Sequence, residues 1–118
     1  MDAAEITRVA EDYGKRLADH REGIETNQVR NVFAHVNRMR VDYKQAGEWT
    51  EGLERTLILL KPKLAYAAGR NRKVRPFQEL LSRSIDAVVA SENKARGVEN
   101  FFALVEGIVA YHKFHGGD

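Results

Sequence analysis

Apolar residues recur at three- and four-residue spacing along most of the chain, which is the pattern of amphipathic helices. This spacing predicts one helix over residues 3–20 and a second over 26–45. Further apolar stripes run through residues 50–68, from residue 76 onward, and through 98–113. No stretch alternates in the way of a strand. The pattern therefore predicts an all-α protein, a compact bundle of about five helices with short connections.

Several predicted helix ends carry residues suited to that position. Thr26 offers a hydroxyl to the first free amides of the second helix, and Gly47 follows its last turn as a stop. We expect Gly69 to adopt a left-handed conformation after the third helix, and Pro76 to occupy the first turn of the fourth. The fifth helix is apolar around more than half its circumference, so we expect it at the centre of the bundle. The tail from about residue 115 is expected to be flexible.

Pro62 lies well inside the predicted third helix, between Lys61 and Lys63. A proline there removes one backbone hydrogen bond and clashes with the carbonyl group four residues earlier. The third helix is therefore expected to be kinked at Pro62. Lys63, Tyr66 and Arg70 follow at i, i+3 and i+7, so they share one face of this helix.

Length and composition fit a single domain over residues 1–118, of which 43% are hydrophobic and 31% charged. The absence of cysteine excludes disulfides and thiol chemistry. No apolar run is long enough to span a membrane, and the polar, acidic N-terminus does not resemble a signal peptide. We therefore expect a cytoplasmic protein.

Charge is unevenly distributed, although the formal net charge is only +2. Residues 30–75 carry eleven basic and four acidic side chains, whereas residues 1–29 and 76–118 are both net acidic. A basic middle region suggests a polyanionic partner, and a well-solvated helical face is the alternative. If the second and third helices pack antiparallel, their basic residues form one continuous strip that ends in the basic loop at residues 70–75.

Histidine is the residue type on which an enzymatic interpretation depends. His112 and His115 stand at i, i+3 near the end of the fifth helix, where they would suit a metal site or an acid–base pair. No third group follows from the spacing, and His20 and His35 are far away in sequence. We therefore expect no catalytic site, no metal and no cofactor. Surface histidines beside a helix C-terminus explain the pattern better.

A protein–protein interaction module is the stronger alternative. A helical bundle without a catalytic set can use aromatic side chains as interface anchors, here Tyr43, Trp49, Tyr66 and Tyr111. Partial burial in the protein's own core is the competing explanation for each. It is favoured for Tyr111, which lies on the most apolar helix.

Three segments in order, "TNQVRNVFAHV", "LKPKLAYAAGR" and "ENFFALVEGIVAYHKFHGG", resemble the small subunit of type III-A CRISPR effector complexes, the Csm interference complex. The similarity covers most of the chain from Thr26 onward. The matching positions are Thr26, Gln28, Val29, Arg30, Tyr66, Ala68, Gly69, Arg70, Val109, Ala110, Tyr111, Lys113, Phe114, Gly116 and Gly117.

The resemblance implies a non-catalytic helical subunit that stacks in several copies along a ribonucleoprotein filament. Its partners would be guide RNA, target RNA, the backbone and large subunits, and other copies of itself, with no membrane involved. Cleavage of RNA and DNA would belong to the neighbouring subunits. The resemblance implies that Arg30 and Arg70 contact RNA. Together with the distribution of charge, it gives the predicted RNA-binding residues: Arg30, Arg38, Arg40, Lys61, Lys63, Arg70, Arg72, Lys73 and Arg75. A helical interaction module without direct RNA contact stays open.

Overall fold

The described residues of the protein form five α-helices and no strand, which confirms the all-α prediction. The structure is a computed structural model that describes residues 2–18 and 26–116, apart from the side chains of residues 26–29 and 73. Its helices are α1 (Ala3–Ala18), α2 (Thr26–Ala46), α3 (Glu51–Arg70), α4 (Arg75–Ala90) and α5 (Lys94–Phe114), with a 3₁₀ turn, η2 (Arg72–Val74), before α4. His20, the side chain of Thr26 and the last two residues of the expected flexible tail lie outside the description.

The helix ends follow local backbone chemistry in most places. Gly47 has φ of 76° directly after α2, as expected for a glycine stop. Thr50 caps α3, and its hydroxyl accepts a hydrogen bond from the Leu53 amide at 3.0 Å. Arg75 begins α4 with Pro76 in its first turn. These ends fix the short connections that hold successive helices antiparallel.

Two predicted boundaries were wrong. α3 continues through Gly69 to Arg70, and the amide of Asn71 donates to the Ala67 carbonyl at 3.0 Å. Among the glycines described, only Gly47 and Gly116 have positive φ, so Gly69 is an ordinary helical residue. α5 starts at Lys94, a turn earlier than residue 98, because the Asn93 side chain caps it by accepting from the Arg96 amide at 3.1 Å.

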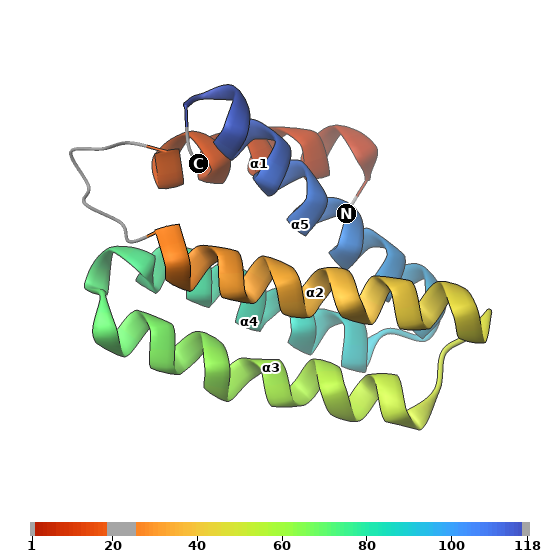
Figure 1. Ribbon diagram of the computed structural model, residues 1–118. Helices are drawn as coiled ribbons and strands as arrows, with labels where there is room; N and C mark the ends of the chain where they lie inside the picture. Colours follow the sequence, from red (N-terminus) through yellow and green to blue (C-terminus); the bar gives the residue numbers. More distant parts are fainter. Residues whose placement is uncertain (1, 19–25, 117–118) are drawn as a thin grey trace.

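α5 occupies the centre of the bundle. It packs against α1, α2 and α4, while α3 packs against α2 and α4. In Figure 1, α2 and α3 run antiparallel, and α1 and α5 lie on the side of α2 away from α3. The fully buried side chains Leu57, Leu64, Leu81, Ile85 and Ile108 join α3, α4 and α5 in one core. The radius of gyration, 13.7 Å, is that of a compact chain of this length.

α1 and α5 cross with their backbones unusually close, because the contact is made of very small residues. A Cβ atom on Gly14 would lie 2.6 Å from the Tyr111 Cβ and 2.8 Å from the Ile108 carbonyl oxygen. A Cβ atom on Gly107 would lie 2.8 Å from the Ala10 Cβ. Each glycine thus provides the space that the other helix occupies.

His112 corrects the expectation of a surface histidine at the end of α5. Its exposed fraction is 5%, and its ring meets Phe33 of α2 edge-on at a centroid distance of 6.5 Å. It follows Ile108 by four residues, so it continues the buried face of α5. His115 is half-buried, with its ring 5.1 Å from that of Phe114.

Pro62 lies on the exposed side of α3, which is a single helix from Glu51 to Arg70. The kink itself stays a prediction. We expect Pro62→Ala to leave the free energy of unfolding within about 1 kcal/mol of the parent, or to raise it, because the amide regained lies outside the core. Urea denaturation measures this change. A loss of several kcal/mol would mean that the proline ring supports the packing of α3.

No helix within the described residues combines the length and hydrophobicity that a membrane crossing requires.

Candidate nucleic-acid interface

Basic side chains of α2 and α3 meet where these antiparallel helices lie side by side. The charges of Lys63 on α3 and Arg38 on α2 both act on His35 of α2. Partial burial lowers the pKa of His35 below its usual 6.5, and the charges of Lys63 and Arg38 lower it further. We call His35, Arg38 and Lys63 the α2–α3 cluster. Because Arg38 and Lys63 are exposed, the cluster presents positive potential to solvent.

Tyr66 and Arg70 extend this surface toward the end of α3, as their spacing from Lys63 predicts. The Arg70 guanidinium donates to the Tyr66 hydroxyl oxygen at 3.3 Å and lies 5.9 Å from the centroid of its ring. The Tyr66 side chain is 67% exposed, so partial burial in the core does not explain this tyrosine. An exposed aromatic ring beside an arginine is a surface on which an unpaired base can stack.

The N-terminal end of α2 and the C-terminal end of α3 lie at the same end of the bundle (Figure 1). Arg30, in the second turn of α2, is exposed there, and Arg72 is exposed in η2 directly after α3. Arg38, Lys63 and Arg70 thus lie on the two helices that were predicted to carry the basic strip. Arg30 and Arg72 lie at the end of the bundle where the strip was predicted to end. The Lys73 side chain lies outside the description.

Two predicted residues face elsewhere, so the strip does not include all of them. Lys61 forms an ion pair with Asp86 of α4 at 2.6 Å, which puts it on the edge of α3 opposite Lys63. Arg40 lies on the α5 side of α2, where it lines a hollow shared with Glu106 and Lys113. The basic surface of α2 and α3 therefore includes Lys63 but not Lys61, because these two lysines lie on opposite sides of α3.

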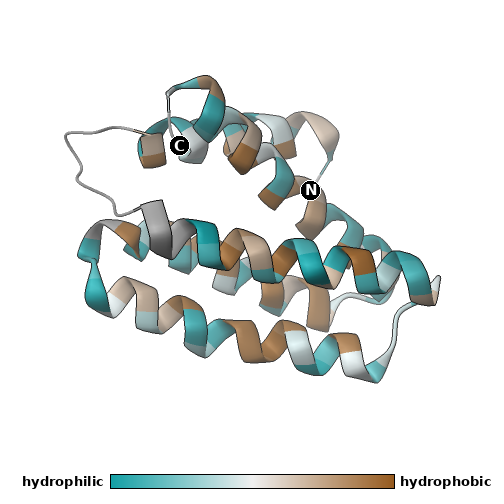
Figure 2. Ribbon diagram, viewed as in Figure 1, coloured by the Kyte–Doolittle hydropathy of each residue, from teal (hydrophilic) through white to brown (hydrophobic). Residues whose placement is uncertain are grey.

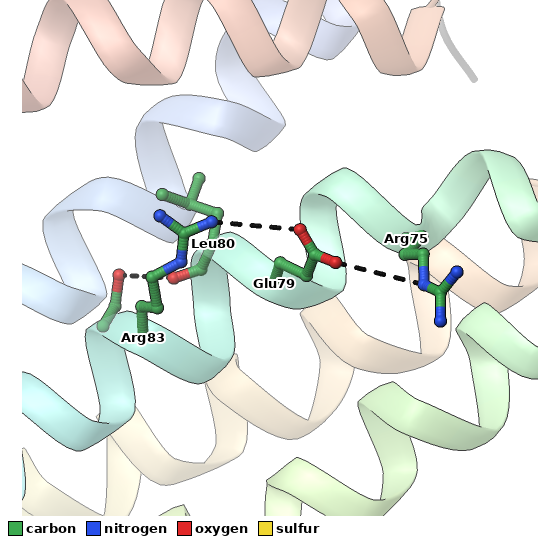
Figure 3. Close-up of polar contacts among 5 residues, drawn as sticks. Arg75, Glu79, Leu80 and Arg83 are labelled. Atoms are coloured by element: carbon green, nitrogen blue, oxygen red, sulfur yellow. Dashed lines mark hydrogen bonds and ion pairs between the residues drawn. The ribbon is translucent and has the colours of Figure 1, made fainter.

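Arg75, at the start of α4, has an acidic neighbour. Its Nε lies 3.9 Å from Glu79 Oε1, and the other oxygen of Glu79 lies 3.8 Å from Arg83 (Figure 3). All three side chains are at least half exposed, so each pair is weak in water. Glu79 nevertheless reduces the positive potential at Arg75, which the pattern of basic residues alone did not reveal.

The sequence did not single out His35 as part of this site. Its separation of three residues from Arg38 was visible, but its approach to Lys63 depends on how α2 packs against α3.

The other aromatic candidates for interface anchors are engaged within the fold. Tyr43, Trp49 and Tyr111 are half-buried and pack against the core, which confirms the expectation for Tyr111. The Tyr43 hydroxyl donates to Glu99 Oε1 of α5 at 3.2 Å. Burial raises the pKa of Tyr43, and the charge of Glu99 and this hydrogen bond raise it further. Within the described part of the chain, no three residues of the metal-binding types lie together.

Comparison with known proteins gives two matches. The family described as Csm2 Type III-A matches residues 1–118. A protein of Enterococcus italicus described as "CRISPR system Cms protein Csm2" is 29% identical over 115 residues, which cover 94% of this chain and 81% of that protein. No solved structure matches the chain significantly.

Proposed function

Because the chain belongs to the Csm2 family and is a small subunit of the type III-A CRISPR effector complex, we propose that it contacts the sugar–phosphate backbone of guide RNA and target RNA through one face of α2 and α3. It acts without catalysis of its own and supports the capture of target RNA. Its protein neighbours are the backbone and large subunits and further copies of itself, stacked along the filament.

The observation that carries this proposal is the α2–α3 cluster with the exposed Tyr66–Arg70 pair beside it. Two helices contribute cations to one surface, and the charges of Lys63 and Arg38 add to the desolvation that lowers the pKa of His35 there. A subunit that serves any guide sequence must read phosphates rather than bases, and lysine and arginine do this without sequence preference. Several copies on one RNA would add their modest affinities through effective concentration.

The geometry ranks the candidate residues. Arg30, Arg38, Lys63, Arg70 and Arg72 are assigned to the RNA face. Lys61 and Arg75 have acidic partners, and Arg40 lies toward α5, so their contributions should be smaller.

Affinity purification of the tagged protein from its native host, at moderate salt, tests the assignment. We expect larger subunits together with short guide RNAs. The purified chain should also bind single-stranded RNA with an affinity that falls steeply as salt rises, since each phosphate contact releases counterions. Recovery of protein partners alone, with no salt-dependent RNA binding by the chain, would favour the interaction module without RNA contact.

RNA binding should strengthen as the pH falls, because of His35. In the free protein Lys63 and Arg38 disfavour its protonation. A phosphate beside them would offset their charge and raise the pKa of His35, so binding would take up a proton. Between pH 7.5 and pH 5.5, at constant salt, we expect about a two- to tenfold gain in affinity. Fluorescence anisotropy measures it, and His35→Gln should remove the gain. An equal gain in that variant would assign the proton to another group.

The lowered pKa of His35 also makes the stability of the free protein depend on pH, and this stability decreases as the pH falls. The folded-state pKa of His35 lies below 6.5, so the unfolded chain takes up the proton first as the pH falls. The contribution of neutral His35 is complete above about pH 6.5 and is lost as the pH decreases toward the folded-state pKa.

A further inference from the structure

The side chain of Tyr66 carries an aromatic ring that the core does not use. It is 67% exposed, whereas Tyr43, Trp49 and Tyr111 are half-buried against the core. Within the described part of the chain, only one other aromatic side chain, Phe114 at the end of α5, is exposed to a similar degree. A single exposed ring is common on protein surfaces, so what has to be explained is the setting of Tyr66.

Arg70 holds the ring of Tyr66 in place. The Arg70 guanidinium donates to the Tyr66 hydroxyl oxygen at 3.3 Å, and its central carbon lies 5.9 Å from the ring centroid. Both residues belong to the last turns of α3, so no loop has to become ordered to bring them together. The ring is thus restrained while most of its surface stays open to solvent. A restrained side chain loses less conformational freedom when it binds a ligand.

Positive charge lies on both sides of this ring along α3. Lys63 lies one turn before Tyr66, and Arg70 lies one turn after it. At 1.5 Å per residue, about 10 Å along the helix axis separates the two cations. Residues 55–78 contain no aspartate or glutamate, and neither do residues 26–41 of α2, which packs beside α3. Figure 2 shows hydrophilic colour at the end of α3.

Two carboxylates of the neighbouring helix α4 are paired with other cations. Asp86 lies 2.6 Å from Lys61, on the side of α3 away from Lys63, and Glu79 lies 3.9 Å from Arg75. The end of α3 therefore offers an open aromatic ring between two cations. A nucleotide matches this arrangement, because it joins a flat base to anionic phosphates.

We propose that Tyr66 stacks on an unpaired base of the bound RNA, while Lys63 and Arg70 contact the phosphates on either side of that nucleotide. The inference rests on the proposed RNA contact of α2 and α3, and it adds that this contact distinguishes unpaired from paired RNA. Inside a duplex, neighbouring bases cover both faces of each base, so no face is left for the tyrosine. In a single strand every base offers a face, so stacking does not restrict the sequence.

Replacement of the ring tests the stacking. Tyr66→Leu should weaken binding of single-stranded RNA by about tenfold and leave binding of a fully paired RNA duplex unchanged, because the phosphate contacts remain. Tyr66→Phe keeps the ring and should retain most of the affinity. Phe114→Leu is the matched control, since it removes an exposed ring from α5, and it should bind both RNAs as the parent does. Fluorescence anisotropy measures the affinities, and circular dichroism confirms that each variant is folded. Equal losses for single-stranded and duplex RNA would overturn the proposal.

A photochemical crosslink locates the contact. Irradiated 5-iodouridine couples to an aromatic side chain that is stacked on it. Single-stranded RNA that contains this base is irradiated with the full chain, and the tryptic peptides are analysed by mass spectrometry. Trypsin releases residues 64–70, in which Tyr66 is the only aromatic residue. We expect the crosslink on this peptide, and we expect it to disappear when the same uridine is paired in a duplex.

The outcomes separate this inference from the function on which it rests. A chain that binds RNA in a salt-dependent way, but crosslinks only through other peptides or equally well to the duplex, would overturn the stacking and leave the phosphate contacts standing. A chain that binds no RNA would overturn both.

Discussion

Gly14→Ala is expected to lower the free energy of unfolding by about 2–3 kcal/mol, a large fraction of the stability of a small domain. The new methyl group would lie 2.6 Å from the Tyr111 Cβ, 2.8 Å from the His112 amide nitrogen and 2.8 Å from the Ile108 carbonyl oxygen. Two of these three atoms belong to the backbone, so no rotamer change relieves the overlap. α1 and α5 must separate, and the loss exceeds the roughly 1 kcal/mol that alanine gains over glycine in a helix.

Gly69→Ala is the matched control, to be measured in the same urea denaturation series. Gly69 lies inside α3, and a Cβ atom there has no neighbour within 4 Å. This substitution should therefore raise the free energy of unfolding by about 0.5–1 kcal/mol. Equal effects at the two positions would contradict the close crossing of α1 and α5. A loss at Gly69 would indicate the left-handed conformation that the sequence suggested.

Reversing Lys63 and Arg70 to glutamate should weaken RNA binding by about 100-fold at physiological salt. The double variant removes two cations from the proposed RNA face and adds two anions that repel phosphate. Both side chains are exposed, so the helical circular dichroism spectrum should match that of the parent. Fluorescence anisotropy with single-stranded RNA measures the affinity across a salt series. The salt dependence should become shallower as well.

Arg8→Glu with Lys15→Glu provides the control for net charge. Both residues are exposed on α1, which packs on α5 away from α3. Their double change alters the formal charge by the same amount as the change of Lys63 and Arg70 to glutamate. RNA affinity should fall far less than in the Lys63 and Arg70 variant. Equal losses would mean that overall charge, rather than the α2–α3 surface, governs binding. An unchanged affinity in the Lys63 and Arg70 variant would refute the proposed RNA face.

The helices themselves were predictable, because the periodicity of apolar residues is a local property of the chain. The capping hydroxyl of Thr50 and the positive φ of Gly47 also follow from near neighbours in sequence. Gly69 was misjudged because a glycine permits the left-handed conformation without requiring it, and the local hydrogen bond from the Asn71 amide to the Ala67 carbonyl continues α3. His112 was misjudged for a different reason. Whether a histidine near a helix end is buried depends on what packs against it, here Phe33 of α2, which is distant in sequence.

The candidate site divides in the same way. The common face of Lys63, Tyr66 and Arg70 follows from their spacing along one helix. Their spacing also separates Lys61 from Lys63, but it does not tell which helix each lysine meets. That requires knowing that Asp86 of α4 lies on one side of α3 and His35 of α2 on the other. Local spacing decides which residues share a face, and packing decides what that face meets.

The partnership of α1 with α5 has a consequence for synthesis of the protein. α1 is made first, yet the helix against which it mainly packs is made last. At about 5–20 residues per second, translation of the intervening segments leaves α1 waiting for roughly 5–20 s. During that time its apolar stripe, which includes Ile6, Ala10 and Leu17, has no native surface to cover it. The emerging chain is therefore most exposed to aggregation and chaperone capture at its N-terminal helix, until α5 leaves the ribosome and closes the bundle.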